Sequence, residues 1–451
     1  MSAAGISDQR AGRTMAGAIY NRPQTVWQRL FVCAYLTMLF GPIYSLFSGI
    51  EGMGIVVRSS NSTIYMAIWA ALYALLAANT VFKYDMFFVP FLRGWAVYLF
   101  FIFAIFSYLS YTPEYYAVYI KFAGYVFSFI FGSYLSSCFG IRNTMKYLIL
   151  IGPFILIFHF LAYPIASNMI DYDLLGRSNV LGFKPYGGFF GHKNLAGIAF
   201  GVLAVCAFDD QALLAFGKFR KVWVGLYFVA LLATGAAGPL IATIMALILA
   251  WGLKLIVRRS QFSFFFLLGS SFTAALAALV GANGLLSLVG RTSGMTGRDM
   301  LFEAWRIYFW QRPMLGYGYA NFFTGLPDSP GAQLMWLTPW HKVFLTFESS
   351  YLEAAIQFGI FGCILLFIIY IMGFYKALKG AMTDPTDSVP RTMVALLVLI
   401  LVSSISDTYL TLQNSIFPTL VAASFYAVYA RPAPRRTRRN EPIPGGGAAR
   451  A

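Results

Sequence analysis

Long apolar runs recur from one end of the chain to the other, and they constrain its fold more than any other feature. Twelve runs approach the length that an α-helix needs to cross a bilayer. They lie at residues 28–48, 63–82, 94–111, 115–138, 146–166, 193–208, 222–236, 239–257, 262–286, 350–376, 391–411 and 414–430. Helices satisfy their own backbone hydrogen bonds in lipid. We therefore predict an all-α, polytopic integral membrane protein with about 12 transmembrane helices.

The composition excludes an ordinary soluble domain. Charged residues make up 11% of the 451 residues, whereas a soluble domain carries about 25%. Three of the runs are less regular than the others: 193–208 is short, and the two that flank TGAAG could form one broken helix. The chain has 3 histidines, and its 4 cysteines form no CxxC pair. This pattern predicts no metal site and no cofactor.

The basic residues predict the orientation. If the N-terminus is inside and the spans alternate, most of the 33 lysines and arginines fall on the cytoplasmic side. The net charge of +16 then reports membrane topology rather than nucleic-acid binding. We expect residues 1–26 to be a disordered cytoplasmic arm without a cleavable signal peptide. Residues 27–430 should form the transmembrane domain, and 431–451 a disordered basic cytoplasmic tail.

Two outward segments, residues 167–192 and 287–349, carry basic residues against this bias, which favours an anionic ligand on the outer face. The larger one is expected to be an outer loop between spans 9 and 10. Within it lie four arginines, whose planar forks suit phosphate: Arg291, Arg298, Arg306 and Arg312. The aromatic helix expected near 297–311 would lie in the membrane interface. The alternative is that these arginines are interfacial anchors or salt-bridge partners.

The smaller segment ends in YGGFFGHKNLAG, where glycines allow close approach to a ligand. His192, Lys193 and Asn194 stand where the sixth helix begins. The free N–H groups and partial positive charge of a helix N-terminus suit phosphate. Alternatively, Asn194 only caps the helix and Lys193 only snorkels.

Three stretches together resemble the superfamily of O-antigen ligases and exopolysaccharide polymerases, with the succinoglycan-type polymerase branch most similar. They are GHKNLAG, GRTSGMTGRDMLFEAWRIYFWQRPMLGYGYANF and SSYLEAAIQFGIFG. The resemblance implies a membrane glycosyltransferase at the periplasmic face of the bacterial inner membrane. Its donor would be an undecaprenyl-diphosphate-linked glycan. It would contact membrane lipid, could work with a chain-length regulator or flippase, and would not bind nucleic acid.

The resemblance also implies roles for individual residues. Arg291 and Arg298 would stabilise the departing diphosphate. Ligases of this family commonly carry His-Asn before the last motif, and this chain has Glu348 and Ser349 there. The general base would then be Glu348, or His341, although Glu348 could instead pair with a loop arginine. The remaining substrate-binding candidates are His192, Lys193, Asn194, Arg306, Arg312 and Tyr351.

Several alternatives stay open at this point. A polymerase would transfer the glycan to the next lipid-linked repeat, and a ligase would transfer it to a lipid A core sugar. A transporter or flippase would need ionisable residues along a path through the membrane, of which the spans have few. A non-catalytic subunit of an assembly machine is also compatible. Asp407, near the outer end of the eleventh span, is a functional candidate; alternatively, it sits at the membrane boundary and is solvated. His159 is expected to be a satisfied core histidine.

Overall fold

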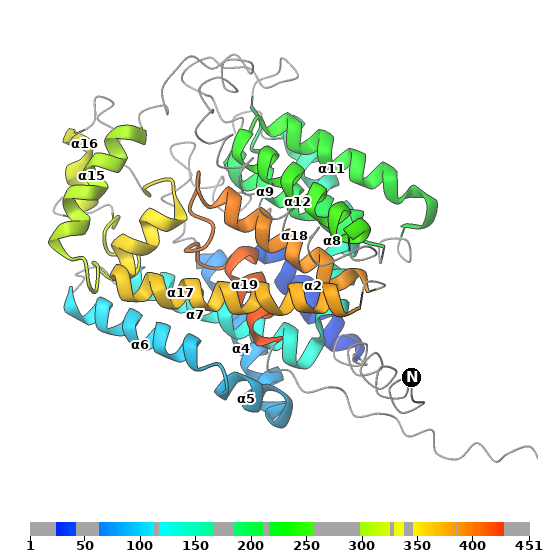
Figure 1. Cartoon of the computed structure of the whole chain (residues 1–451), viewed down its shortest axis with the longest axis horizontal. Helices are drawn as coiled ribbons and strands as arrows, with labels where there is room; N and C mark the ends of the chain where they lie inside the picture. Colours follow the sequence, from blue (N-terminus) through cyan, green and yellow to red (C-terminus); the bar gives the residue numbers. More distant parts are fainter. Residues whose placement is uncertain are drawn as a thin grey trace, which may run out of the picture.

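The computed structural model describes residues 24–41, 63–111, 117–165, 185–190, 192–210, 216–256, 298–324, 329–337, 346–384 and 387–427. Every regular element within these ranges is a helix, which confirms the all-helical class (Figure 1). Four predicted parts lie wholly or largely outside the described residues: the arm 1–26, the segment 167–192, the span 262–286 and the tail 431–451. The loop 287–349 is described over 298–324, 329–337 and 346–349.

Most helices match the predicted runs in position. They are α2 (Val26–Leu39), α4 (Thr63–Phe82), α5 (Tyr84–Leu92), α6 (Trp95–Ser110), α7 (Ala117–Tyr134), α8 (Ile141–Ile165), α9 (Lys193–Phe208), α11 (Arg220–Thr234), α12 (Ala237–Ile256), α15 (Arg298–Gln311), α16 (Pro330–Leu337), α17 (Ser350–Thr383), α18 (Ser388–Ser403) and α19 (Ile416–Tyr426). Within the described ranges, 5 helices are long and apolar enough to cross a membrane. Others, α9 and α18 among them, are apolar but shorter, so twelve spans remain a prediction.

The pair of runs around TGAAG forms two helices rather than one broken helix. Gly235 follows α11 with φ 65°, a left-handed conformation that glycine adopts easily and that ends the helix. α12 begins two residues later. Arg220 at the start of α11 and Lys254 near the end of α12 both contact Asp210. The two helices are therefore antiparallel.

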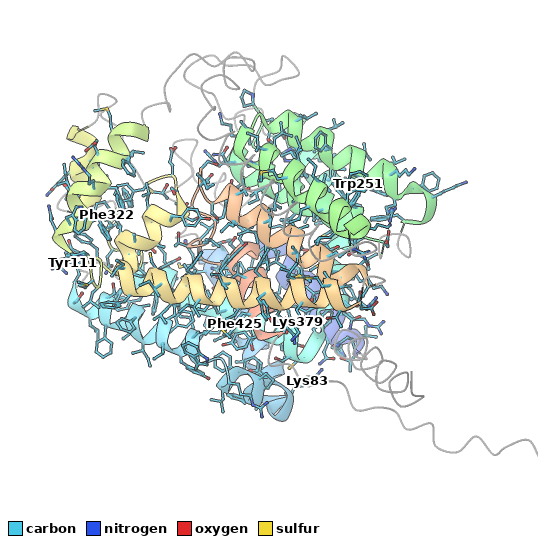
Figure 2. The ribbon with its side chains drawn as sticks, in the orientation of Figure 1. Lys83, Tyr111, Trp251, Phe322, Lys379 and Phe425 are labelled. Atoms are coloured by element: carbon cyan, nitrogen blue, oxygen red, sulfur yellow. The ribbon has the colours of Figure 1, made fainter. Side chains whose placement is uncertain are left out.

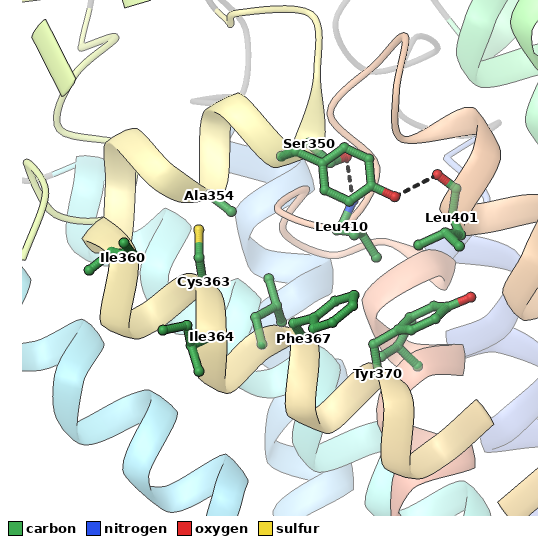
Figure 3. Close-up of a pocket in the computed structure, with 12 residues that line it drawn as sticks. Ser350, Ala354, Ile360, Cys363, Ile364, Phe367, Tyr370, Leu401 and Leu410 are labelled. Atoms are coloured by element: carbon green, nitrogen blue, oxygen red, sulfur yellow. Dashed lines mark hydrogen bonds between the residues drawn. The ribbon is translucent and has the colours of Figure 1, made fainter. Parts of the chain in front are cut away.

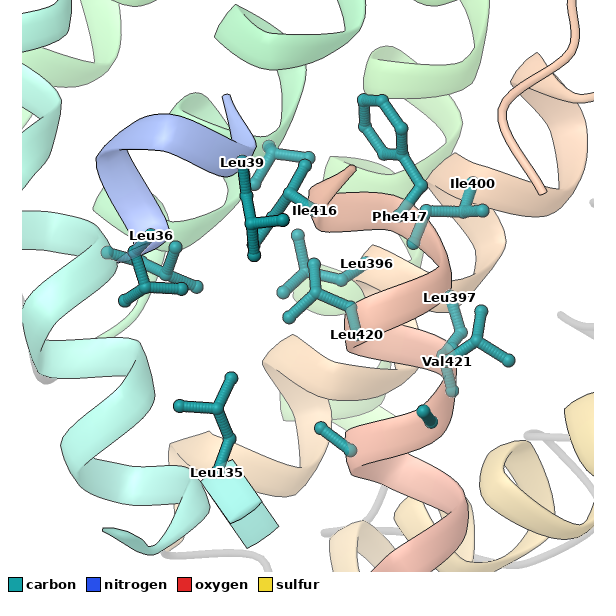
Figure 4. Packing of buried hydrophobic residues seen from close by; sticks show 14 of the residues in the cluster. Leu36, Leu39, Leu135, Leu396, Leu397, Ile400, Ile416, Phe417, Leu420 and Val421 are labelled. Atoms are coloured by element: carbon teal, nitrogen blue, oxygen red, sulfur yellow. The ribbon is translucent and has the colours of Figure 1, made fainter. Parts of the chain in front are cut away.

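The interior of the bundle consists of α9, α18 and α19, which are buried along almost their whole length. Leu39 of α2, Leu396 of α18 and Leu420 of α19 belong to one apolar cluster (Figure 4). Large apolar side chains on α6, α8 and α17 are instead exposed, such as Phe106 and Phe367. An apolar surface of this extent is stable where it meets lipid.

Charged residues gather at one end of the bundle. The Asp210 carboxylate is 3.0 Å from Arg220, 3.3 Å from Lys254 and 3.5 Å from Arg391. The alternating topology placed these three basic residues on the same, cytoplasmic side. Their convergence agrees with that alternation, while the direction across the membrane remains a prediction.

The opposite end carries α15 and α16, beyond the start of α17 (Figure 1). Figure 2 shows Tyr111 and Phe322 at this end, and Lys83 and Lys379 away from it. The first residues of α9 and α17 also lie here, because both make hydrogen bonds to the residues that follow α18. We call this the outer end, following the predicted topology.

One part of the fold differs from the predicted spans 391–411 and 414–430. α18 ends at Ser403 and α19 begins at Ile416, and the residues between them, SISDTYLTLQNS, are not helical. Serine, threonine, aspartate and asparagine side chains compete for backbone hydrogen bonds and so interrupt helices. Irregular backbone at membrane depth is stable only inside protein or beside a cavity. We call residues 404–415 the outer segment.

Candidate functional site

The outer segment joins the first turns of two helices that are far apart in the sequence. The Tyr409 hydroxyl donates a hydrogen bond to the Asn194 carbonyl of α9, at 3.0 Å. At the start of α17, the Ser350 N–H and hydroxyl both donate to the Asp407 carbonyl, at 2.9 and 2.8 Å. Ser350 Oγ also accepts the Leu410 N–H at 3.0 Å. The HKN sequence and the last family motif therefore meet on one irregular segment.

The turn that follows α15, PMLGYG at residues 313–318, packs on a kink in α17. Gly359 has φ 63° and ψ −172° inside this helix, a conformation that only glycine adopts readily. The interruption leaves two carbonyls free, and the turn uses both of them. Tyr317 N–H donates to Ile356 at 2.8 Å, and Gly318 N–H donates to Gln357 at 2.9 Å. The kink thus fixes α15 against the outer half of α17.

Glu348 lies directly before α17, where the sequence predicted it, and it is partly exposed. Its φ of 53° is unusual for a residue other than glycine. The Glu348 N–H donates to Thr346 Oγ1 at 3.1 Å. The neighbouring Phe347 is buried against the rings of Phe322 and Phe323, at centroid distances of 5.1 and 4.9 Å. Backbone strain of this kind persists only where neighbours impose it, and it is frequent in functional sites.

Sequence reasoning gave no role to Glu353, which is only 4% exposed. Its carboxylate accepts the Phe347 N–H at 3.0 Å and the Gln357 side-chain N–H at 2.8 Å. The N-cap residue Ser349 makes no side-chain capping bond. An acidic residue in the first turn of a helix is a known signal for capping, and this signal could have identified Glu353.

The HKN sequence begins α9, as predicted, but the capping residue is different. His192 is the N-cap, and its Nδ1 accepts the Asn194 N–H at 3.3 Å. The alternative that Asn194 caps the helix is therefore wrong, because Asn194 supplies the capped N–H. His192 is exposed, while Lys193 and Asn194 are partly buried. The helix N-terminus remains a candidate for phosphate.

Beneath the turn before α9 lies His159, which is fully buried. Its ring contacts those of Tyr186, Phe190 and Phe200, with centroids 4.7, 5.7 and 4.8 Å away. The prediction of a core histidine is right as to burial. The prediction that its ring nitrogens are hydrogen-bonded is not met within the described residues, where neither nitrogen has a partner.

Two of the four loop arginines contact protein groups. Arg306 pairs with Glu303 at 3.0 Å on the exposed face of α15. Arg312 donates to the Ser110 carbonyl at 3.1 Å and lies over the Tyr111 ring, 4.8 Å from its centroid. For these two arginines, the contacts agree with the alternative that they are anchors or salt-bridge partners rather than phosphate ligands.

The remaining polar candidates are placed only in part. Arg298 is the first residue of α15, whereas Arg291 and His341 lie outside the described residues. Asp407 lies in the outer segment, beyond the end of α18, and is partly exposed, which is the boundary position rather than a place within a helical span. One of its carboxylate oxygens accepts the Thr408 N–H at 2.8 Å, and the other is buried without a partner among the described residues.

An apolar cavity of about 330 Å³ begins beside the start of α17 (Figure 3). α17 lines it from Ser350 to Tyr370, and Leu410 of the outer segment and Val421 of α19 close it. Tyr351 also lines the cavity, and its hydroxyl donates to the Leu401 carbonyl at 2.8 Å. The cavity suits a hydrocarbon chain and lies next to the polar groups of the outer end.

Fold and site together define an all-helical membrane protein with polar groups at one end beside an apolar cavity. The chain is 25% identical over 250 residues to the exopolysaccharide production protein ExoQ of Rhizobium meliloti (strain 1021). This alignment covers 52% of the chain and 54% of that relative, so the chain spans about half its length. The similarity supports the family that the motifs indicate, that of exopolysaccharide polymerases and O-antigen ligases. No family model matches the chain.

Proposed function

We propose that this chain polymerises undecaprenyl-diphosphate-linked polysaccharide repeat units at the periplasmic face of the bacterial inner membrane. One observation carries the proposal: the HKN start of α9 and the Glu348 start of α17 converge on the outer segment, beside an apolar cavity. A lipid-linked glycan needs this combination of polar and apolar surfaces. The similarity to a protein of exopolysaccharide production supports the same substrate class.

In the proposed reaction, Glu348 takes the proton of the attacking sugar hydroxyl. The hydroxyl oxygen forms a bond to the anomeric carbon of the donor glycan, and the bond from this carbon to the diphosphate oxygen breaks. Undecaprenyl diphosphate leaves with the bonding electrons, and Arg291 and Arg298 stabilise its growing charge. Glu348 then releases its proton to water. His341 is the alternative base.

The donor would lie along the outer half of α17. Its diphosphate would face the N-terminus of α9, where His192, Lys193 and Asn194 stand. The first part of its lipid chain would enter the apolar cavity past Tyr351, and the rest would remain in the bilayer. Arg312 would contribute mainly by fixing the end of α15 and its turn, since it already donates to the Ser110 carbonyl of α6. Arg306 pairs with Glu303 of the same helix on its exposed face, so we give it no part in the site.

The test is turnover of a lipid-linked repeat by the purified, reconstituted protein. Glu348→Gln should lower the rate by a factor of about 10² to 10⁴. The control Glu303→Gln, on the exposed face of α15, should leave the rate unchanged. Arg298→Lys keeps the charge but loses the fork, and it should also reduce turnover severely. Normal turnover by Glu348→Gln together with an inactive His341→Ala would move the base to His341.

Two other activities are weaker candidates. A ligase would make the same bond to a lipid A core sugar, but Glu348 stands where ligases commonly carry histidine. A flippase would need a path through the membrane. The contacts of Asp210 with Arg220, Lys254 and Arg391 join α11, α12 and α18 at the inner end, which does not favour such a path.

A further inference from the structure

We propose that Glu353 is a positioning residue that holds the loop 346–349, and with it Glu348, in the geometry that the reaction requires. This inference rests on the proposed function only for the role of Glu348. The position of the loop itself is a property of the fold. The two parts can therefore be tested separately.

The loop is held from both sides. On one side, Glu353 accepts the N–H of Phe347, the residue directly before Glu348. On the other side, Ser350 is bound to the outer segment through Asp407 and Leu410. Glu348, between these two attachments, has its φ of 53°. A free chain would leave this conformation for a commoner one and would turn the Glu348 side chain away.

Several features single out Glu353 for this task. The loop N–H that it accepts is buried with Phe347, which is 2% exposed, and needs a partner there. The usual capping residue of the helix, Ser349, makes no side-chain bond to α17. Glu353 itself is fixed by the Gln357 side chain one turn later, which donates to its other carboxylate oxygen at 2.8 Å. The carboxylate is therefore an anchored acceptor in the bundle.

A different role for Glu353 would be that of the base itself, since buried carboxylates in membrane helices are often functional. The two roles predict opposite results for two conservative substitutions. Glu353→Gln keeps the length of the side chain and removes its charge. Glu353→Asp keeps the charge but is shorter by one methylene, so that it can no longer reach the Phe347 N–H.

Gln357 makes the glutamine variant a fair test of position. Its Oε1 is buried and has no partner among the described residues. If the side-chain amide of Gln357 rotates by about 180°, so that its oxygen and nitrogen exchange places, this oxygen can accept the new N–H of Glu353→Gln. The new side-chain carbonyl can then still accept the Phe347 N–H. The loop should therefore keep its geometry without the charge of Glu353.

The experiment measures the full-length protein in lipid nanodiscs in two ways. Hydrogen exchange of the peptide that contains Phe347 reports whether the loop is held. The values of kcat and KM for the lipid-linked repeat report whether the loop matters for chemistry. We expect Glu353→Asp to speed exchange at Phe347 by about tenfold or more and to lower kcat with little change in KM. Glu353→Gln should resemble the wild type in both measurements.

Three results separate the possibilities. Unchanged exchange in Glu353→Asp would overturn the positioning role. An inactive Glu353→Gln with a protected Phe347 amide would also overturn it, because the charge or the proton would then be what matters. If Glu353→Asp loosens the loop while Glu348→Gln remains fully active, the loop attachment stands and the proposed base is wrong.

Discussion

Replacing Gly359 by alanine should break the contact between α17 and the turn after α15. Gly359 has φ 63° and ψ −172°, in a region that is essentially confined to glycine. An added Cβ would also lie 2.1 Å from the Met314 carbonyl oxygen. This oxygen belongs to backbone and not to a flexible side chain, so the turn itself has to move.

The size of the effect follows from the contacts that would be lost. The backbone conformation costs about 1–3 kcal/mol for a residue with a side chain. Displacing the turn removes three hydrogen bonds, Tyr317 to Ile356, Gly318 to Gln357 and Ile360 to Pro313, of 2.8, 2.9 and 2.8 Å. Each is worth about 0.5–1.5 kcal/mol. Together they give a loss of about 3–7 kcal/mol in the free energy of unfolding.

The assay is thermal stability of the detergent-solubilised protein, followed as the fraction that stays monodisperse. Gly225→Ala is the matched control, because Gly225 lies within α11 and its added Cβ would meet nothing within 4 Å. Alanine favours a helix over glycine by about 1 kcal/mol, so this variant should be as stable as the wild type or slightly more so. Equal stability of Gly359→Ala and the wild type would refute the reasoning.

Two further predictions concern the inner end and the topology. Burial raises the pKa of the Asp210 carboxyl, but hydrogen bonds from Arg220 and Lys254 outweigh it and hold this pKa below its ordinary value. The stabilisation is therefore present at neutral pH and lost as the pH falls below about 4. Asp210→Asn should lower thermal stability at pH 7 and flatten its acid dependence, and identical pH curves would contradict this. Alkaline phosphatase should be active when fused near Ser329 and inactive after Arg439, whereas the reverse pattern would end the outer-face assignment.

The helices were predictable because their signals are local. The run 193–208 coincides with α9, Lys193–Phe208, and the run 63–82 with α4, Thr63–Phe82. Apolar residues over a sufficient length determine such a helix, and no distant contact is needed to recognise it. The place of Glu348 before α17 was predictable for the same reason, since it depends on where a long apolar run begins.

The outer segment was not predictable from hydropathy, because apolar residues such as Tyr409 and Leu410 are interspersed among its polar ones. Its hydrogen-bond partners are distant in sequence: the Asn194 carbonyl for the Tyr409 hydroxyl, and the Ser350 hydroxyl for the Leu410 N–H. Glu353 is a different case, because its place in the first turn of α17 is a local capping signal. Only its partner, the Phe347 N–H, depends on how the loop turns back over the helix. Tertiary contacts decide these features, and a single sequence does not contain them.

The most direct test of the proposed polymerase is product analysis with the purified wild-type protein and one lipid-linked repeat unit as the only substrate. We predict a ladder of lipid-linked oligomers that differ by one repeat, with one undecaprenyl diphosphate released for each bond formed. Consumption of the repeat only after a lipid A core acceptor is added would contradict the polymerase and indicate a ligase. Movement of the intact repeat across the bilayer without a new glycosidic bond would contradict both and indicate a flippase.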